Sequence, residues 1–99
     1  MIKHVVLFKF KAFENEEDKF EKLIEIKEAL EALTDHIPEL KSMEVGLNAN
    51  DNESFDLALL STFESMTDME QYAKHPAHMA VSAMIGLLKE DRACVDYIF

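Results

Sequence analysis

The chain has 99 residues, of which 48% are apolar and 30% are charged, and it carries a formal net charge of −10 at pH 7. This length and composition predict a single globular domain over residues 1–99 with a hydrophobic core of its own. The acidic charge disfavours nucleic acid and anionic membranes as partners, and the lack of a long apolar run or a signal-peptide pattern predicts a soluble, cytoplasmic protein.

The N-terminal half of the chain predicts a strand, a helix and a second strand. Residues 2–10 alternate with period two and are apolar on both faces at their centre, which is typical of a strand covered on both sides. Residues 15–34 predict a helix, with Asn15 as its N-cap and acidic residues in its first turn. The apolar stripe of this helix consists of Phe20, Leu23, Ile24, Leu30 and Leu33. Pro38 ends the segment, and residues 40–47 predict the second strand.

The C-terminal half predicts a third strand, a broken helix and a last strand. Residues 55–64 alternate and are again apolar on both faces at their centre. The segment Thr67-Asp68-Met69-Glu70 has the form of a capping box and predicts the start of a helix. Pro76 interrupts this helix and suits the first position of a second one. Residues 92–99 predict the last strand, with Cys94, Asp96 and Ile98 on one face.

The order of these elements, β-α-β-β-α-β, predicts the α+β class and a ferredoxin-like fold with a four-stranded antiparallel sheet. Two helices can cover only one face of a four-stranded sheet. The uncovered face would expose an apolar patch that monomers rarely tolerate, made of Val5, Leu7, Ala58, Leu60, Val95, Tyr97 and Phe99. We therefore expect a homodimer in which two sheets pack face to face into a dimeric α/β barrel.

The segment from Tyr72 to His78 places a phenol and two imidazoles around the helix break. His78 falls in the first turn of the second helix, on its apolar stripe, where desolvation and the helix dipole favour the neutral imidazole, a competent base near pH 7. Asp96 and His4 fall on the sheet face assigned to the helices, where the Asp96 carboxylate could accept a hydrogen bond from His78. Tyr72 could donate to a developing enolate or oxyanion. Together these residues fit proton abstraction next to a carbonyl.

Each of these residues also has an interpretation without chemistry. A histidine such as His78 on an apolar helix face is typical of a core position. A pair between His4 and Asp96 could simply hold the register of two strands, and Tyr72 could be ordinary packing. His75 is expected to cap the second helix rather than to react.

The sequence predicts no metal centre and no cofactor. His75 and His78 are three residues apart, but no third ligand for a catalytic zinc ion is evident near them. Cys94 is the only cysteine, which excludes an intrachain disulfide and a Cys-x-x-Cys redox or zinc site, and we expect it to be a small, inert apolar residue. The two isolated glycines form no phosphate loop for a flavin or a nicotinamide.

Several stretches together resemble one known family. They are the opening strand from Ile2 to Phe10, the pair Ile37-Pro38 followed by the strand that ends in Val45-Gly46, the segment from Tyr72 to His78 with its His-Pro-Ala-His core, and the closing Val95-Asp96-Tyr97. On these residues the chain is similar, over essentially its whole length, to the stress-responsive A/B barrel (Dabb) family of dimeric α/β barrels. The resemblance implies the ferredoxin-like fold and the sheet-to-sheet homodimer.

The resemblance also implies a type of activity. A plant branch of the family contains polyketide cyclases that perform an intramolecular aldol condensation without a cofactor. Their catalytic tyrosine and histidine match Tyr72 and His78, and a histidine of the first strand and an aspartate of the last strand match His4 and Asp96. A pocket histidine of that branch is replaced here by Leu57, which changes the polar pocket. Most members have no assigned activity, and related dimeric barrels include cofactor-free monooxygenases.

Two hypotheses of different classes follow. The first is a small-molecule enzyme, cyclase- or lyase-like, that uses His78 as base and Tyr72 as donor on a small hydrophobic, aromatic or polyketide-like ligand. Its supporting or binding residues are His4, Asp96 and His75. The second is a non-catalytic, stress-responsive or ligand-binding dimeric barrel. A cavity that reaches the His78 ring favours the first hypothesis, and a filled core favours the second.

Overall fold

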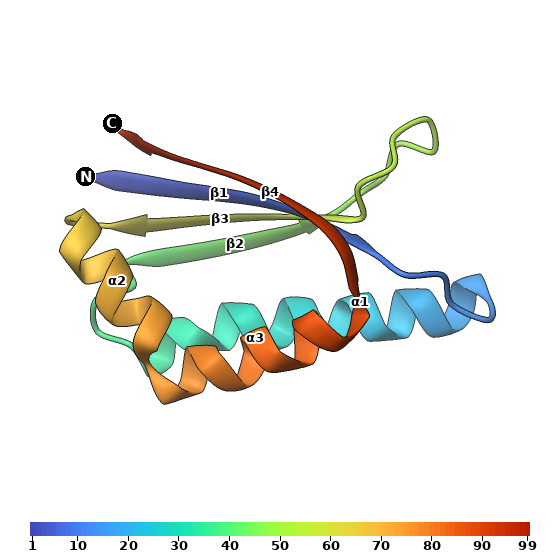
Figure 1. Cartoon of the computed structure of the whole chain (residues 1–99), viewed down its shortest axis with the longest axis horizontal. Helices are drawn as coiled ribbons and strands as arrows, with labels where there is room; N and C mark the ends of the chain where they lie inside the picture. Colours follow the sequence, from blue (N-terminus) through green and yellow to red (C-terminus); the bar gives the residue numbers. More distant parts are fainter.

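In the computed structural model, which describes residues 1–99, a four-stranded antiparallel sheet carries all helices on one face and leaves the other face open (Figure 1). The strands are β1 (Ile2–Phe10), β2 (Ser42–Leu47), β3 (Leu57–Phe63) and β4 (Lys89–Ile98). The helices are α1 (Glu16–Glu31), a following 3-10 turn η1 (Ala32–Asp35), α2 (Met66–Lys74) and α3 (Pro76–Leu88). The strand order β2-β3-β1-β4 confirms the α+β, ferredoxin-like fold. No helix combines the length and the apolar character that a membrane crossing needs.

Strand β1 lies between β3 and β4, and its residue His4 faces a polar residue on each of these strands. His4 lies opposite Ser61 of β3 on one side and opposite Asp96 of β4 on the other. Because residues directly opposite each other project on the same face of a sheet, these three side chains form one row. β4 is the outer strand of the sheet, and all of its residues are exposed.

The core lies between the helix-covered face of the sheet and α1. In β3 every second residue from Leu57 to Phe63 is buried and the residues between them are half-buried, which confirms the predicted alternation. One cluster contains all the buried apolar residues, and its main members are Val6, Phe8, Leu30, Ile37, Leu57, Phe63 and Tyr72. The sheet and α1 thus form most of the core, and Tyr72 of α2 and Ile85 of α3 add to it.

Helix α1 differs from the predicted stripe in two residues. Asn15 is the N-cap, as predicted, and its side-chain oxygen accepts from the backbone N–H of Asp18 at 2.8 Å. Phe20, however, is 60% exposed, whereas Ile26 is fully buried. Phe20 belongs to the first half of α1, which extends past the end of α3 in Figure 1, whereas Ile26 belongs to the second half and to the core cluster.

Four element starts were predicted at the wrong residue, and two of them, β2 and β3, begin at Ser42 and Leu57 rather than at residues 40 and 55. The N-cap of α2 is Ser65, not Thr67, and its hydroxyl accepts from the backbone N–H of Asp68 at 3.1 Å. Strand β4 begins at Lys89 rather than at residue 92 and pairs with β1 as far as Phe10. The added residues are charged and carry no alternation, but an exposed outer strand accepts charged side chains on both faces.

Candidate functional site

A cavity lies between the helix-covered face of the sheet and helices α2 and α3. It has two parts, of about 130 Å³ and about 330 Å³, which share His4, Tyr72, His78 and Arg92 in their walls. The smaller part is otherwise lined mainly by core residues of β1, β3 and α3, and the larger part by residues of α2 and β4. The core is therefore open around the His78 ring, and three residues that were singled out from the sequence meet in one cavity.

The break between α2 and α3 determines the hydrogen bonding of His78. His75 is the N-cap of α3, as predicted, and its Nδ1 accepts from the backbone N–H of Ala77 at 3.1 Å. In a continuous helix that N–H would bond to the carbonyl of Ala73 four residues earlier. The break leaves this carbonyl free, and it accepts a hydrogen bond from His78 Nδ1 at 3.0 Å. Since a carbonyl only accepts, Nδ1 carries the proton, and Nε2 of the neutral ring is left as an acceptor.

Burial keeps His78 neutral. Desolvation is the largest cause that lowers the pKa of His78 below its ordinary value of 6.5, and a smaller lowering comes from the charge of nearby His4. The hydrogen bond to the Ala73 carbonyl acts in the opposite direction, because it favours the protonated ring. The result is a half-buried imidazole that is uncharged at neutral pH and has one free nitrogen.

Tyr72 packs against His78 and keeps its phenol protonated. The centroids of the two rings are 4.4 Å apart, and Phe63 packs on the tyrosine with a centroid distance of 5.0 Å. Tyr72 is 3% exposed, and burial raises the pKa of its hydroxyl well above the usual range. No group of the chain forms a hydrogen bond with this hydroxyl, so it remains a donor for a ligand in the cavity.

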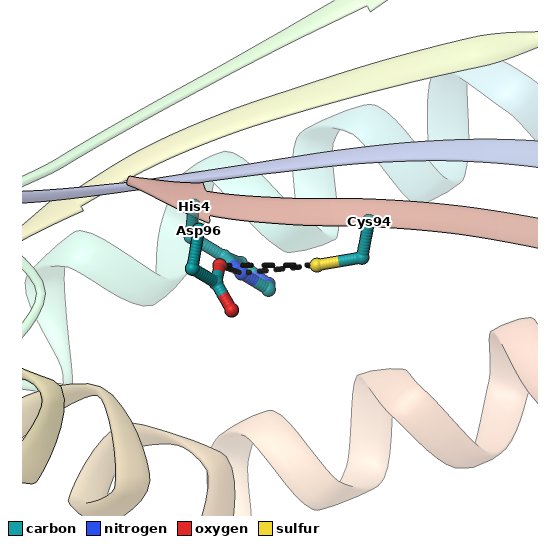
Figure 2. A group of neighbouring side chains, drawn as sticks. All are labelled: His4, Cys94 and Asp96. Atoms are coloured by element: carbon teal, nitrogen blue, oxygen red, sulfur yellow. Dashed lines mark hydrogen bonds and ion pairs between the residues drawn. The ribbon is translucent and has the colours of Figure 1, made fainter. Parts of the chain in front are cut away.

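His4 and Asp96 form a hydrogen-bonded pair across β1 and β4 (Figure 2). His4 Nδ1 donates to the Asp96 carboxylate, and the two side chains are 14% and 26% exposed. The predicted bond from His78 to Asp96 is therefore wrong, since His78 donates to the Ala73 carbonyl and Asp96 accepts from His4. His4 also contacts the edge of Phe63, which ties the pair to the aromatic cluster.

Cys94 belongs to the same polar group, so the prediction that it is a small apolar residue is wrong. The residue is exposed, and its Sγ lies 3.6 Å from His4 Nδ1 and 3.8 Å from a carboxylate oxygen of Asp96 (Figure 2). Burial of the thiol and the negative charge of Asp96 both raise the pKa of Cys94. The free thiol is therefore protonated at neutral pH and is a poor nucleophile.

Sequence reasoning missed the basic residues in the cavity wall. Arg92, the only arginine of the chain, lines both parts of the cavity, and Lys89 lines the smaller part. Neither side chain forms an ion pair with a carboxylate, although the chain has 20 acidic residues. The available signal was the spacing along β4, because Arg92 lies two and four residues before Cys94 and Asp96 and so shares their face.

His75 is the one candidate that lies apart from the others. Its Nδ1 is occupied by the N–H of Ala77, and the side chain lines neither part of the cavity. The residue acts on the site through the helix break that it caps, which frees the carbonyl that holds His78.

The fold and the cavity together define a ferredoxin-like α+β domain with one open sheet face and a pocket lined by histidine, tyrosine and arginine. The family model of the stress responsive A/B barrel domain matches residues 2–99, and the chain belongs to this family. No curated protein matches the chain.

Solved structures with the same fold include dimeric proteins of unknown function and enzymes. A dimeric protein of unknown function and ferredoxin-like fold from Bacteroides fragilis is 43% identical, with a TM-score of 0.92 over 99% of this chain and 95% of that one. A dimeric ferredoxin-like protein of unknown function from Thermobifida fusca is 28% identical, with a TM-score of 0.81 over 99% and 90%. A hydroxynitrile lyase from Passiflora edulis is 19% identical, with a TM-score of 0.77 over 99% and 92%, and it shares the fold.

Proposed function

We propose that this chain is a homodimeric enzyme that abstracts a proton next to a carbonyl group, with His78 as base and Tyr72 as donor to the enolate oxygen. Such chemistry serves a cyclase, which closes a ring by intramolecular aldol condensation, or a lyase. The observation that carries the proposal is the 3.0 Å hydrogen bond from His78 Nδ1 to the Ala73 carbonyl, because it leaves Nε2 unprotonated in a residue that lines the cavity.

In the proposed reaction, Tyr72 first binds the substrate carbonyl and His78 then removes the proton. The substrate carbonyl accepts a hydrogen bond from the Tyr72 hydroxyl, and His78 Nε2 takes a proton from the adjacent carbon. The C–H electron pair moves into an enolate, whose developing charge the tyrosine stabilises. In a cyclase the enolate carbon attacks a second carbonyl of the same molecule, and the new alkoxide takes the proton back. Since burial disfavours the imidazolium, return of this proton is favourable.

The charge of the cavity wall supports an anionic substrate. Arg92 has no carboxylate partner, and the planar fork of a guanidinium matches a carboxylate in two hydrogen bonds. Lys89 adds a second positive charge to the smaller part of the cavity. We therefore assign the carboxylate of a small keto acid to Arg92, with its reacting carbonyl between Tyr72 and His78.

The pair of His4 and Asp96 has a supporting role in this proposal. The carboxylate accepts from His4 Nδ1 and so fixes the orientation of the ring, which leaves Nε2 without a partner in the chain. Both residues line the larger part of the cavity, where Nε2 can form a hydrogen bond with a polar group of the ligand. The pair thus positions the substrate and leaves proton abstraction to His78.

The dimer in the proposal forms through the open sheet face. Apolar residues of that face are exposed in one chain, among them Val95 at 56%, Tyr97 at 45% and Phe99 at 55%. Two relatives of the same fold, which are 43% and 28% identical to this chain, are described as dimeric. A partner on this face would bury the patch and leave the cavity between sheet and helices accessible from the other side.

Deuterium exchange tests the proposal at its first step. The wild-type chain is incubated in D2O with a panel of small β-keto carboxylates, and exchange at the carbon next to the carbonyl is followed by NMR. We expect His78→Gln to lower the exchange rate by at least about 10²-fold, as for the loss of a general base. Tyr72→Phe should cost about 10²-fold, as for the loss of an oxyanion donor.

His36→Gln is the matched control, because His36 is exposed and lies outside the cavity. This variant should exchange like the wild type. Equal exchange rates in the wild type and in His78→Gln would overturn the proposal. Saturable binding of a keto acid without any enhanced exchange would assign the cavity to ligand binding alone.

A further inference from the structure

A nitrogen, a sulfur and an oxygen ligand converge at one point of the sheet, on the side that faces the helices (Figure 2). They belong to His4, Cys94 and Asp96, and the ligand atoms all lie within 4.8 Å of one another. From this geometry we infer that the cluster binds a single divalent transition-metal ion of the Zn²⁺ type. The inference does not depend on the proposed reaction, because it rests on the positions of these side chains alone.

Two of the three distances within the cluster fit tetrahedral coordination. With Zn–S near 2.3 Å and Zn–N or Zn–O near 2.0–2.2 Å, a tetrahedral ion separates a sulfur from a nitrogen or oxygen ligand by about 3.6 Å. Cys94 Sγ is 3.6 Å from His4 Nδ1 and 3.8 Å from Asp96 Oδ1. The nitrogen and the carboxylate oxygen are in hydrogen-bond contact and would separate to about 3.3 Å, so the ion takes the place of the proton they share.

The strand scaffold holds the three ligands in place. His4 and Asp96 are opposite residues of the paired strands β1 and β4, and Cys94 lies two residues before Asp96 on the same face. Adjacent strands fix these positions through their ladder of backbone hydrogen bonds. Only the side-chain torsions have to adjust when an ion binds, and Asp96 is exposed enough to turn.

The ligand set selects the kind of metal and leaves one position open. Thiolate and imidazole favour zinc-like ions, whereas Mg²⁺ and Ca²⁺ prefer a shell made of oxygen atoms. Three protein ligands leave the fourth tetrahedral position free, as in catalytic zinc sites. The three residues line the larger part of the cavity, so this position is open to water or to a ligand.

Binding moves two protons and removes one hydrogen bond. The Cys94 thiol releases its proton to the solvent and becomes a thiolate, and the neutral ring of His4 carries its proton on Nε2 instead of Nδ1. The bond between His4 and Asp96 is then replaced by two bonds to the metal. The metal-bound cluster and the hydrogen-bonded pair are therefore alternative states of the same residues.

Cobalt titration of the full-length chain tests the inference, because Co²⁺ reports its ligands by absorption. We expect one equivalent to produce the strong visible bands of a tetrahedral ion and a thiolate-to-cobalt charge-transfer band. Since Cys94 is the only cysteine, this band can arise only from the proposed site or from binding to that thiol alone. Addition of Zn²⁺ should abolish both signals, and an excess of Mg²⁺ should leave them unchanged.

Variants separate a built site from binding at a thiol. Cys94→Ser should lose the charge-transfer band. His4→Gln and Asp96→Asn should each weaken Co²⁺ binding by at least about 10-fold, because the loss of a residue that only hydrogen-bonds to a metal ligand already has an effect of this size. His36→Gln, which removes an exposed histidine elsewhere, should bind as the wild type does. Thermal unfolding of each variant without metal checks that it is folded. A wild type without the band, or a band of equal affinity in His4→Gln and Asp96→Asn, would overturn the inference.

Discussion

At the scale of single residues, burial keeps His78 neutral, and a backbone carbonyl rather than a carboxylate determines which ring nitrogen carries the proton. Its Nδ1 donates to the Ala73 carbonyl, and desolvation lowers its pKa below the ordinary 6.5. The base is thus neutral at physiological pH without help from Asp96, whose carboxylate accepts from His4 instead. In the proposed reaction, this arrangement would separate the group that moves the proton from the pair that contacts the substrate.

The lowered pKa of His78 predicts two pH dependences. Because neutral His78 is the base, the exchange rate should stay at its plateau below pH 6.5 and fall only when the pH drops through the lowered pKa. Unfolding restores the ordinary pKa, so the unfolded chain binds this proton first and stability falls as the pH decreases below 6.5. Between pH 7.5 and pH 5.5, the free energy of unfolding measured with urea should decrease less for His78→Gln than for the wild type. A rate profile with its midpoint above pH 6.5 would contradict the assignment.

Ser61 is the one buried side-chain polar atom without a hydrogen-bond partner. It is 0% exposed and lies opposite His4 in the row that leads to the site. Leaving a buried hydroxyl unpaired costs about 1–3 kcal/mol, so Ser61→Ala should leave the free energy of unfolding unchanged or raise it by about 1 kcal/mol. Urea unfolding measures this, with exposed Ser54→Ala as control. A loss of more than about 1 kcal/mol in Ser61→Ala would show that the hydroxyl is bonded in solution.

At the scale of elements, the junction of α2 and α3 links stability to the site. His75 caps α3 through Nδ1, and this cap leaves the Ala73 carbonyl to His78. His75→Ala should lower the free energy of unfolding by about 1 kcal/mol, whereas His75→Asn, which retains a capping acceptor, should lose less. Urea unfolding of both variants measures the difference. An equal loss in both would contradict the capping role.

The strands that form the sheet could be predicted from sequence to a large extent. Alternation in residues 2–10 and 55–64 identified the buried face of each strand, because apolar residues recur at every second position when one face of a strand is buried. The start of β4 at Lys89 could not be predicted, since an outer strand in solvent places no constraint on its side chains. The same limit applies to Phe20, whose exposure depends on where the helices end relative to one another.

The candidate site could be predicted only in part. Tyr72 and His78 are neighbours in sequence and flank the visible helix break, so local reasoning located them. The pair of His4 and Asp96 was one interpretation of the sequence, but whether Asp96 contacts His4 or His78, and where Cys94 lies, depends on the register of strands that are about 90 residues apart. Arg92 was missed although its spacing along β4 places it on the face of Cys94 and Asp96, because that spacing does not show that a cavity forms over this face.

At the scale of the whole molecule, the two faces of the sheet differ in what covers them. One face carries the helices and the cavity, and the other face is uncovered in a single chain (Figure 1). The uncovered face is apolar, which a soluble monomer rarely tolerates over a large area. Assembly through this face and chemistry on the other side would not interfere with each other.

Tyr97→Asp should weaken the dimer, because it would bury an unpaired charge between two apolar sheet faces. Such a charge costs several kcal/mol, which is enough to shift the assembly to monomers at micromolar concentration. Light scattering should give half the mass of the wild-type assembly. Asn52→Asp adds the same charge in an exposed loop and should leave the mass unchanged. If Tyr97→Asp has the same mass as the wild-type assembly, the open sheet face is not the interface.

The most direct test of the central claim is an NMR titration of the histidine rings, with and without a small β-keto carboxylate. The chain has four histidines, and single His→Gln variants assign their signals. We predict that His78 titrates below pH 6.5 and that its signal moves when the keto acid is added, whereas the signal of exposed His36 does not move with the ligand. A His78 ring with an ordinary pKa that ignores every ligand would contradict the claim that this cavity holds an accessible base.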